Sequence, residues 1–184
     1  MEYQTAVVPV TPMPAADYID KKAVKQIADK LQIILDVEAP VEVDRLIKKT
    51  LRGFGINRTN PQVVEATEKA LKKVPFKAYR QNGKKFYYTS EQTLDAYSTY
   101  RIDVNVEDKR GLDEICVQEL KNAVCITLQK KGEMLKDDLV RETIRTMGYS
   151  RSRAALVDAV GMGLKYGVKT GEIGVDEKKI YYLK

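Results

Sequence analysis

The chain has 184 residues and a formal net charge of +6, and 43% of its residues are hydrophobic and 32% are charged. This composition is typical of a globular protein of one or two domains, and no apolar run approaches the roughly 18 residues that a membrane helix needs. The first ten residues lack the basic start and the apolar core of a secretory signal. We therefore expect a cytoplasmic protein without membrane contact.

Histidine is absent from the sequence, and the two cysteines are Cys116 and Cys125. Nine residues apart on one expected helix, these cysteines lie on nearly opposite faces and cannot bridge each other, and a zinc site needs about four ligands. Without histidine the usual general base is missing, and no cluster of carboxylates or lysines replaces it. No G-x-x-x-x-G-K-[ST] phosphate loop occurs. We predict a protein that is not an enzyme and that holds no metal and no cofactor.

The N-terminal part of the chain begins with residues 1–19, which contain three prolines and no apolar periodicity. This segment reads as an extended tail or a linker. Apolar residues then recur at helical spacing over 22–37 and again over 43–54, which predicts two helices. Gly55 follows the second helix, as is common at helix C-termini.

A third helix and a β-hairpin follow in the sequence. Asn60-Pro61 combines a preferred N-cap residue with a proline at the first helical position, so it predicts the start of the third helix. The period then changes from helical to alternating over 77–81 and 84–88. The dipeptide Asn82-Gly83 between these segments is a strong signal for a two-residue hairpin turn. Three helices and a hairpin predict a winged helix.

A second copy of this unit follows later in the chain. Residues 39–74 recur without a gap as residues 132–167, and the identical positions include Asp44/Asp137, Leu46/Leu139, Thr50/Thr143, Arg52/Arg145, Gly55/Gly148, Arg58/Arg151, Ala66/Ala159, Leu71/Leu164 and Lys72/Lys165. A repeat of this length usually marks one supersecondary unit used twice. For the second copy we expect helices over 115–130, 136–147 and 152–166 and strands over 171–175 and 178–183.

The predicted fold class is α+β and mostly α, with two tandem winged-helix units. We expect a tail over 1–19, the first unit over 20–94, a bridge over 95–113 and the second unit over 114–184. In the bridge, an edge strand is suggested by the alternation of Tyr100, Ile102, Val104 and Val106. Within the last helix, Gly161 and Gly163 suggest close packing.

Four sequence blocks resemble a known domain of unknown function. They are Glu38-Ala-Pro-Val41, Phe54-Gly-Ile-Asn-Arg58, residues 113–123 and residues 139–151. This domain lies at the C-terminus of large bacterial superfamily 1 helicase-like proteins, often after a restriction-endonuclease-like segment. The resemblance covers about residues 25–170, and Ala39 departs from the family's usual glycine. It implies an accessory module of a DNA-processing machine, with helicase or nuclease domains as partners, and it supplies no catalytic residue.

Basic residues are unevenly distributed between the two copies. From Arg45 to Lys85 there are twelve basic and two acidic residues, and from Lys136 to Lys179 there are nine basic and seven acidic ones. In a helix-turn-helix the second helix of the motif, here the third helix of the unit, enters the major groove while the hairpin flanks the backbone. We therefore expect DNA, double-stranded or forked, to be bound through Arg58, Asn60, Gln62, Lys69, Lys72, Lys73, Lys77, Arg80, Lys84, Lys85, Arg151 and Arg153.

Several of these residues also have a purely structural interpretation. Arg58 and Arg151 follow the helix-ending glycines, where an arginine can bond the last carbonyls of the helix instead of a phosphate. The lysines can form an ordinary solvated face, and Tyr79 and Tyr87 can pack on the helices instead of stacking on bases. Glu65 and Glu68 on the third helix argue against DNA contact.

The expected function is a non-catalytic DNA-binding module of a helicase-type or nuclease-type protein, acting mainly through phosphates. The alternative is a protein–protein docking module in the same kind of machine, without DNA contact, and fold alone does not separate the two. A sequence-specific repressor is a third possibility, but the unequal charges of the copies argue against it.

Overall fold

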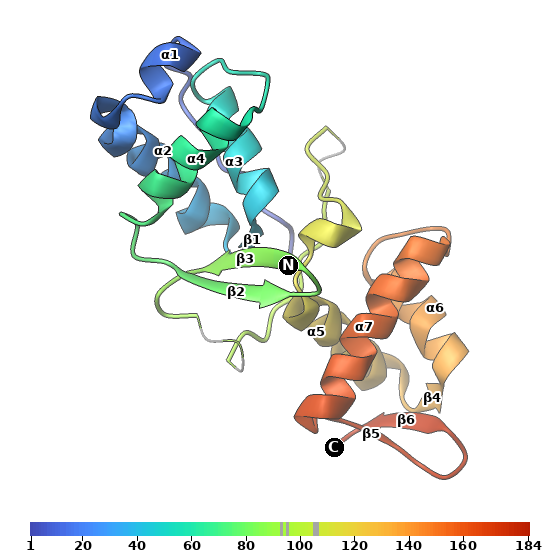
Figure 1. Cartoon of the computed structure of the whole chain (residues 1–184). Coiled ribbons are helices and arrows are strands. Elements are labelled where there is room, and N and C mark those ends of the chain that lie inside the picture. Colours follow the sequence, from blue (N-terminus) through green and yellow to red (C-terminus); the bar gives the residue numbers. More distant parts are fainter. Residues whose placement is uncertain (93, 95, 105–106) are drawn as a thin grey trace. The chain divides into compact units, whose positions relative to one another are not determined.

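The computed structural model describes residues 1–92, 94, 96–104 and 107–184. The described part is an α+β fold, about half helical, with two small antiparallel sheets (Figure 1). The chain divides into two compact units, and each is described by itself. The N-terminal unit is Gln4–Thr93, and the C-terminal unit is Met1–Tyr3 together with Leu94–Lys184.

The described residues of the N-terminal unit form four helices, a 3-10 turn and a three-stranded sheet. These elements are α1 (Ala15–Tyr18), η1 (Lys21–Ala23), α2 (Val24–Glu38), β1 (Val41–Glu42), α3 (Val43–Arg52), α4 (Pro61–Leu71), β2 (Lys77–Gln81) and β3 (Lys84–Tyr88). The sheet order is β1-β3-β2, and both pairings are antiparallel. The expected helices and the expected hairpin strands are confirmed, whereas the two-residue β1 was not anticipated.

Local signals explain where α4 and the hairpin begin. The Asn60 side chain accepts a hydrogen bond from the Val63 amide at 3.0 Å, and Pro61 is the first residue of α4, as expected. In the hairpin turn, Asn82 has φ 48° and Gly83 has φ 78°. Positive φ at both central residues is the type I′ geometry that an Asn-Gly turn favours. The predicted turn is confirmed.

The described residues of the C-terminal unit form three helices, a 3-10 turn and a second three-stranded sheet. These elements are η2 (Leu112–Glu114), α5 (Val117–Lys131), β4 (Met134–Leu135), α6 (Lys136–Thr146), α7 (Ala154–Thr170), β5 (Ile173–Val175) and β6 (Ile180–Leu183). The sheet order is β4-β6-β5, again antiparallel. The order of helices and strands from α5 to β6 matches that from α2 to β3.

The helix-ending glycines occupy corresponding places in the two units. Gly55 has φ 72° and Gly148 has φ 85°, so both adopt the left-handed conformation that favours glycine. In each unit the next residue closes the turn, since Ile56 donates to the Leu51 carbonyl at 3.0 Å and Tyr149 donates to the Ile144 carbonyl at 3.1 Å.

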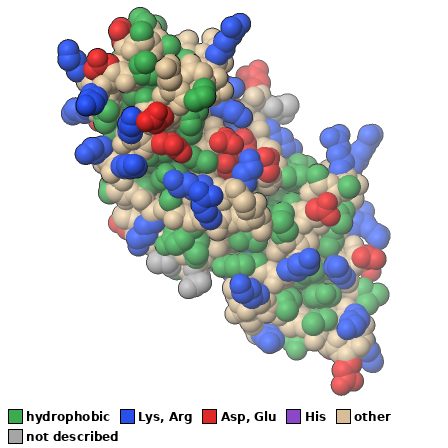
Figure 2. Space-filling model, viewed as in Figure 1, with side chains coloured by type: hydrophobic (Ala, Val, Ile, Leu, Met, Phe, Trp, Pro, Cys, Tyr) green, Lys and Arg blue, Asp and Glu red, His purple; other side chains and the backbone are tan. Residues whose placement is uncertain are grey.

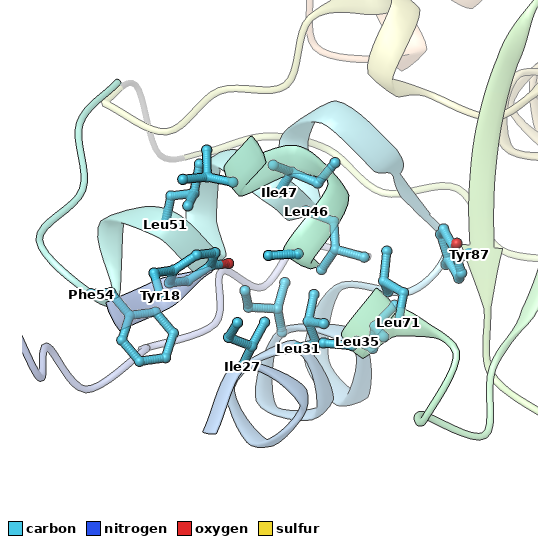
Figure 3. Packing of buried hydrophobic residues seen from close by; sticks show 14 of the residues in the cluster. Tyr18, Ile27, Leu31, Leu35, Leu46, Ile47, Leu51, Phe54, Leu71 and Tyr87 are labelled. Carbon is cyan, nitrogen blue, oxygen red and sulfur yellow. The ribbon is translucent and has the colours of Figure 1, made fainter. Parts of the chain in front are cut away.

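Each unit has its own hydrophobic core. In the N-terminal unit the apolar faces of α2, α3 and α4 meet, and Tyr18 and Phe54 pack edge to face with ring centroids 5.2 Å apart (Figure 3). Ile27, Leu31 and Leu46 are fully buried there. The core of the C-terminal unit lies among α5, α6, α7 and β5.

The first nineteen residues, expected to be an extended tail or linker, include a short helix and buried side chains. Residues 15–18 form α1, and Tyr18 is fully buried, with its hydroxyl 2.6 Å from that of Thr67. Ala6 donates its amide hydrogen to Glu38 Oε1 at 2.9 Å. Residues 4–19 are therefore packed on the N-terminal unit, because Ala6 and Tyr18, on either side of the prolines, contact α2 and α4.

The expected edge strand in the bridge is not formed over the described residues. Ile102 makes a single parallel bridge with Glu2, and Tyr3 donates to the Ile102 carbonyl at 2.9 Å. Val106 lies outside the described residues. Buried ion pairs hold this segment instead, since Arg101 and Arg110 both contact Glu119 of α5.

Candidate nucleic-acid interface

The basic excess of the N-terminal unit contains two kinds of side chain. Of the twelve basic residues between Arg45 and Lys85, four are engaged by acidic side chains within the described part of the chain. Arg45 and Lys49 are buried and pair with the buried Glu38. These two cations neutralise a buried carboxylate and are not available on the surface. A count of charges along the sequence does not distinguish them from surface cations.

Lys69 and Lys84, both predicted to bind DNA, are also paired. Lys69 lies 2.7 Å from Glu65 one helical turn away, and both side chains are more than half exposed. Lys84 Nζ lies 3.6 Å from Asp44 Oδ2 and 4.0 Å from Glu42 Oε1. The Glu42 side chain is 1% exposed. Burial raises its pKa, and the nearby Lys84 opposes that rise. Lys84 therefore compensates an internal carboxylate.

Eight basic residues remain after the four paired ones are removed. Among the residues that the structure describes, none of the eight has an acidic partner, and they are Lys48, Arg52, Arg58, Lys72, Lys73, Lys77, Arg80 and Lys85. All are exposed except Lys85, which is half-buried. Lys and Arg side chains are spread over the visible face of the N-terminal unit, with acidic side chains among them (Figure 2).

The hairpin places two of these cations opposite each other. Arg80 of β2 and Lys85 of β3 are cross-strand neighbours. Like charges at such positions destabilise a sheet unless another group compensates them. Lys85 Nζ lies 5.0 Å from the centre of the Tyr87 ring, a cation–π contact that stabilises Lys85 but supplies no negative charge. The pair is therefore well suited to an anionic ligand.

The hairpin tyrosines pack against other parts of the protein. Tyr87 and Tyr88 are buried, and Tyr79 packs edge to face on Tyr88 with ring centroids 5.4 Å apart. Gln81 donates to the Tyr88 hydroxyl at 2.9 Å. These contacts favour the packing interpretation over base stacking.

The loop before α4 has one structural residue and one exposed arginine. Asn60 uses its side-chain oxygen to cap α4, so part of its hydrogen-bonding capacity is occupied. Arg58 is exposed and makes no hydrogen bond to a carbonyl of α3 within the described residues. The turn-holding role considered for Arg58 is therefore not observed. Gln62 is exposed on the first turn of α4, beside Asp20 and Lys21.

Two exposed cations on α3 were missing from the predicted site. Lys48 and Arg52 are four residues apart, on one face of the helix, and they border a hollow of about 290 Å³ with Ile56 and Thr59. Arg58 lies in the same loop, one residue before Thr59. The spacing of Lys48 and Arg52 on the expected second helix is a signal that the sequence contains.

In the C-terminal unit, the predicted cations lie at the start of α7. Arg151 and Arg153 are exposed and line a hollow with Lys109, whose Nζ is 4.2 Å from the centre of the Tyr149 ring. No side chain caps α7, because Arg153 occupies the N-cap position. Arg151 makes no hydrogen bond to the carbonyls of α6 within the described residues. The arrangement is favourable for an anion.

Neither metal nor membrane features accompany these surfaces in the described part of the chain. No group of three or more histidine, cysteine, aspartate or glutamate side chains there could hold a metal ion. Cys116 and Cys125 are both free thiols, and burial raises the pKa of Cys125. None of the described helices combines the length and the apolar character needed to cross a membrane.

Comparison with known proteins places a family similarity in the N-terminal unit. Residues 17–65 match the model of a family described as "Protein of unknown function (DUF3320)". The matched span holds α2, α3 and the start of α4, and with them the blocks 38–41 and 54–58. It ends before the blocks at 113–123 and 139–151. Searches of curated proteins and of solved structures each find no match to the chain.

Proposed function

We propose that the chain is a non-catalytic DNA-binding module built from two winged helices, and that its N-terminal unit contacts the phosphate backbone. The element order and the sheet order support the winged-helix assignment. In this arrangement α3 and α4 form the helix-turn-helix, β2 and β3 form the wing, and β1 extends the wing to a three-stranded sheet. The C-terminal unit repeats the arrangement with α6, α7, β5, β6 and β4.

One observation carries the DNA proposal. Eight cations between Arg45 and Lys85 lack an acidic partner within the described residues, although five acidic groups of the N-terminal unit neutralise other cations. The unpaired cations lie on α3, in the loop before α4, just after the end of α4 and in the wing. A duplex contacts these parts of a winged helix through its phosphates.

The surface of α4 favours backbone contact over base reading. Glu65 and Glu68 are exposed on this helix, and Lys69 is held by Glu65. A carboxylate on the groove side repels phosphates, and the eight unpaired cations between Arg45 and Lys85 lie outside the bounds of α4. Binding of this kind has little sequence preference and depends steeply on salt.

The resemblance to domains of helicase-like proteins suggests where such a module acts. We place it beside helicase or nuclease domains of a DNA-processing protein, where it holds DNA while another domain performs the chemistry. The match to a family of unknown function over 17–65 is consistent with this placement and carries no activity of its own.

Fluorescence anisotropy with random-sequence duplex, single-stranded and forked DNA tests the proposal. The test variant is Lys72→Ala/Lys77→Ala/Arg80→Ala, whose three side chains are exposed in the N-terminal unit. The matched control is Lys130→Ala/Lys169→Ala/Lys178→Ala, which removes the same charge from exposed positions of the C-terminal unit. The test variant should weaken binding to every sequence and reduce the salt slope by about 0.9 for each phosphate that the protein no longer neutralises.

Two outcomes would count against the proposal. Equal losses in the test and control variants would show that only net charge matters and that the N-terminal surface has no special role. Absence of binding to all three DNA forms at low salt would remove the DNA function and leave the docking alternative.

A further inference from the structure

Helix α7 contains three interior glycines, and only two of them have a packing reason. A Cβ on Gly163 would lie 2.6 Å from the backbone of Leu120, and one on Gly167 would lie 2.4 Å from Ile173. Both glycines therefore let α7 approach its neighbours. A Cβ on Gly161 would meet nothing within 4 Å. Because glycine destabilises a helix interior relative to alanine, the chain's own fold gives no reason for Gly161.

Gly161 lies on the floor of an open hollow between α6 and α7. The hollow has a volume of about 570 Å³, and its apolar part comes from Val140, Val157, Gly161 and Met162. Val157 and Met162 are 41% and 37% exposed. A groove of this kind suits a helix that packs closely, because the missing Cβ lets another backbone or side chain approach.

The charges that border this face have opposite signs at its two ends. Asp158 and Lys165 are exposed, line the same hollow and have no partner within the described residues. They are seven residues apart, which is close to two helical turns, so they lie on one face at a separation of about 10 Å. Gly161 and Met162 lie midway between them.

We infer that this face of α7 binds the same face of a second copy of the chain in an antiparallel, two-fold symmetric arrangement. With the symmetry axis between Gly161 and Met162, Asp158 of each copy faces Lys165 of the other. Met162 of each copy then covers Gly161 of the other and fills the space that the missing Cβ leaves. A two-fold interface needs such a self-complementary patch.

The chemistry of the groove distinguishes this occupant from a nucleic acid. Lys136, Arg141 and Lys165 line the hollow too, but a phosphate backbone would also face the exposed carboxylates of Asp137 and Asp158. An apolar floor bordered by charges of both signs matches a second amphipathic helix, and the sequence of α7 already supplies one with the required order of charges. The inference does not depend on DNA binding by the N-terminal unit.

Charge reversal provides a sharp test by sedimentation velocity on the full chain. Asp158→Lys and Lys165→Asp should each weaken the dimer, because either change turns both symmetric contacts into repulsive ones. We expect the dissociation constant to rise by about tenfold or more. A mixture of the two variants should form a heterodimer. One copy then has lysine at both positions and the other has aspartate at both, so two attractive pairs form across the axis. The double variant should regain the homodimer.

Substitution at Gly161 tests the shape of the interface. Gly161→Leu should abolish the dimer while circular dichroism stays unchanged, because the side chain projects into open space in the single copy. A chain that stays monomeric at the highest concentration reached would overturn the inference. A dimer that tolerates Gly161→Leu and both charge reversals would overturn it as well, since another surface would then hold the copies together. Loss of dimerisation with unchanged DNA affinity would leave the proposed function intact.

Discussion

Replacing Glu119 by glutamine should destabilise the C-terminal unit strongly. Glu119 Oε2 lies 2.8 Å from Arg101 Nη2 and 3.0 Å from Arg110 Nη1, and all three side chains are at most 7% exposed. Asp103, also buried, pairs with Arg110 at 3.1 Å. The four charges cancel in the native chain. Glutamine keeps the shape of the side chain but leaves one buried positive charge without compensation.

The size of the effect follows from the cost of an uncompensated buried charge. Breaking one partner of a buried pair costs about 3–5 kcal/mol. For a unit of this size each kcal/mol lowers the melting temperature by about 4–8 °C, so the transition of this unit should fall by at least about 12 °C. Burial opposes ionisation of Glu119, but the two arginines overcome it and hold its pKa below the usual range. The loss should therefore be complete above pH about 4.3 and shrink as the pH falls through the lower, folded-state value.

Differential scanning calorimetry with hydrogen exchange measures this loss and locates it. Exchange should accelerate in α5 and α7 and stay unchanged in α2, α3 and α4. Glu177→Gln is the matched control, because Glu177 is exposed and has no partner within the described residues. If Glu119→Gln melts with the native chain, or if both substitutions cost the same, the buried network does not stabilise the unit as argued.

Three further predictions concern single residues. Asn60→Ala should cost about 1 kcal/mol in urea unfolding because it removes the cap of α4, and it should leave DNA affinity unchanged when measured well below the denaturation midpoint; a selective loss of affinity would assign Asn60 to the interface. Gly163→Ala should lower the melting temperature because its Cβ would meet the Leu120 backbone, whereas Gly161→Ala should raise that of the monomer; the same sign for both would contradict the packing argument. Burial raises the pKa of Tyr18 to about 12 against the weaker effect of its bond to Thr67, so the stability that neutral Tyr18 contributes is complete below pH 10 and is lost as the pH rises through about 12. Tyr18→Phe should make the free energy of unfolding less dependent on pH between about 10 and 12. An identical pH dependence in the native chain and the variant would contradict the assignment.

The elements that the sequence predicted well are those with local signals. Asn60-Pro61 and Asn82-Gly83 determine a helix start and a turn through bonds and dihedral preferences of neighbouring residues, and both are present in the structure. β1 and β4 were not predicted because two-residue strands have no periodicity, and they exist only through pairing with β3 and β6.

The candidate site was predicted less well because pairing between charges is not local in sequence. Lys49 pairs with Glu38 eleven residues away, and Lys84 lies near Glu42. The charge balance of residues 45–85 includes both lysines but not their acidic partners, which lie before residue 45. Conversely, Lys48 and Arg52 were visible in the sequence at helical spacing. The open space beside Gly161 could not be predicted from the sequence, because the sequence does not distinguish Gly161 from the closely packed Gly163.

The path of the chain through its two units makes residues 4–93 a closed loop. Met1–Tyr3 belong with Leu94–Lys184, and Tyr3 lies against the guanidinium groups of Arg101 and Arg110, 5.0 and 4.0 Å from its ring centre. If the N-terminal unit is unfolded, docking Tyr3 means closing a flexible loop of about 90 residues, which costs about 4 kcal/mol of chain entropy. A folded N-terminal unit removes most of that cost. Connectivity alone therefore makes the attachment of the first three residues depend on the folding of the unit that separates them from their partners.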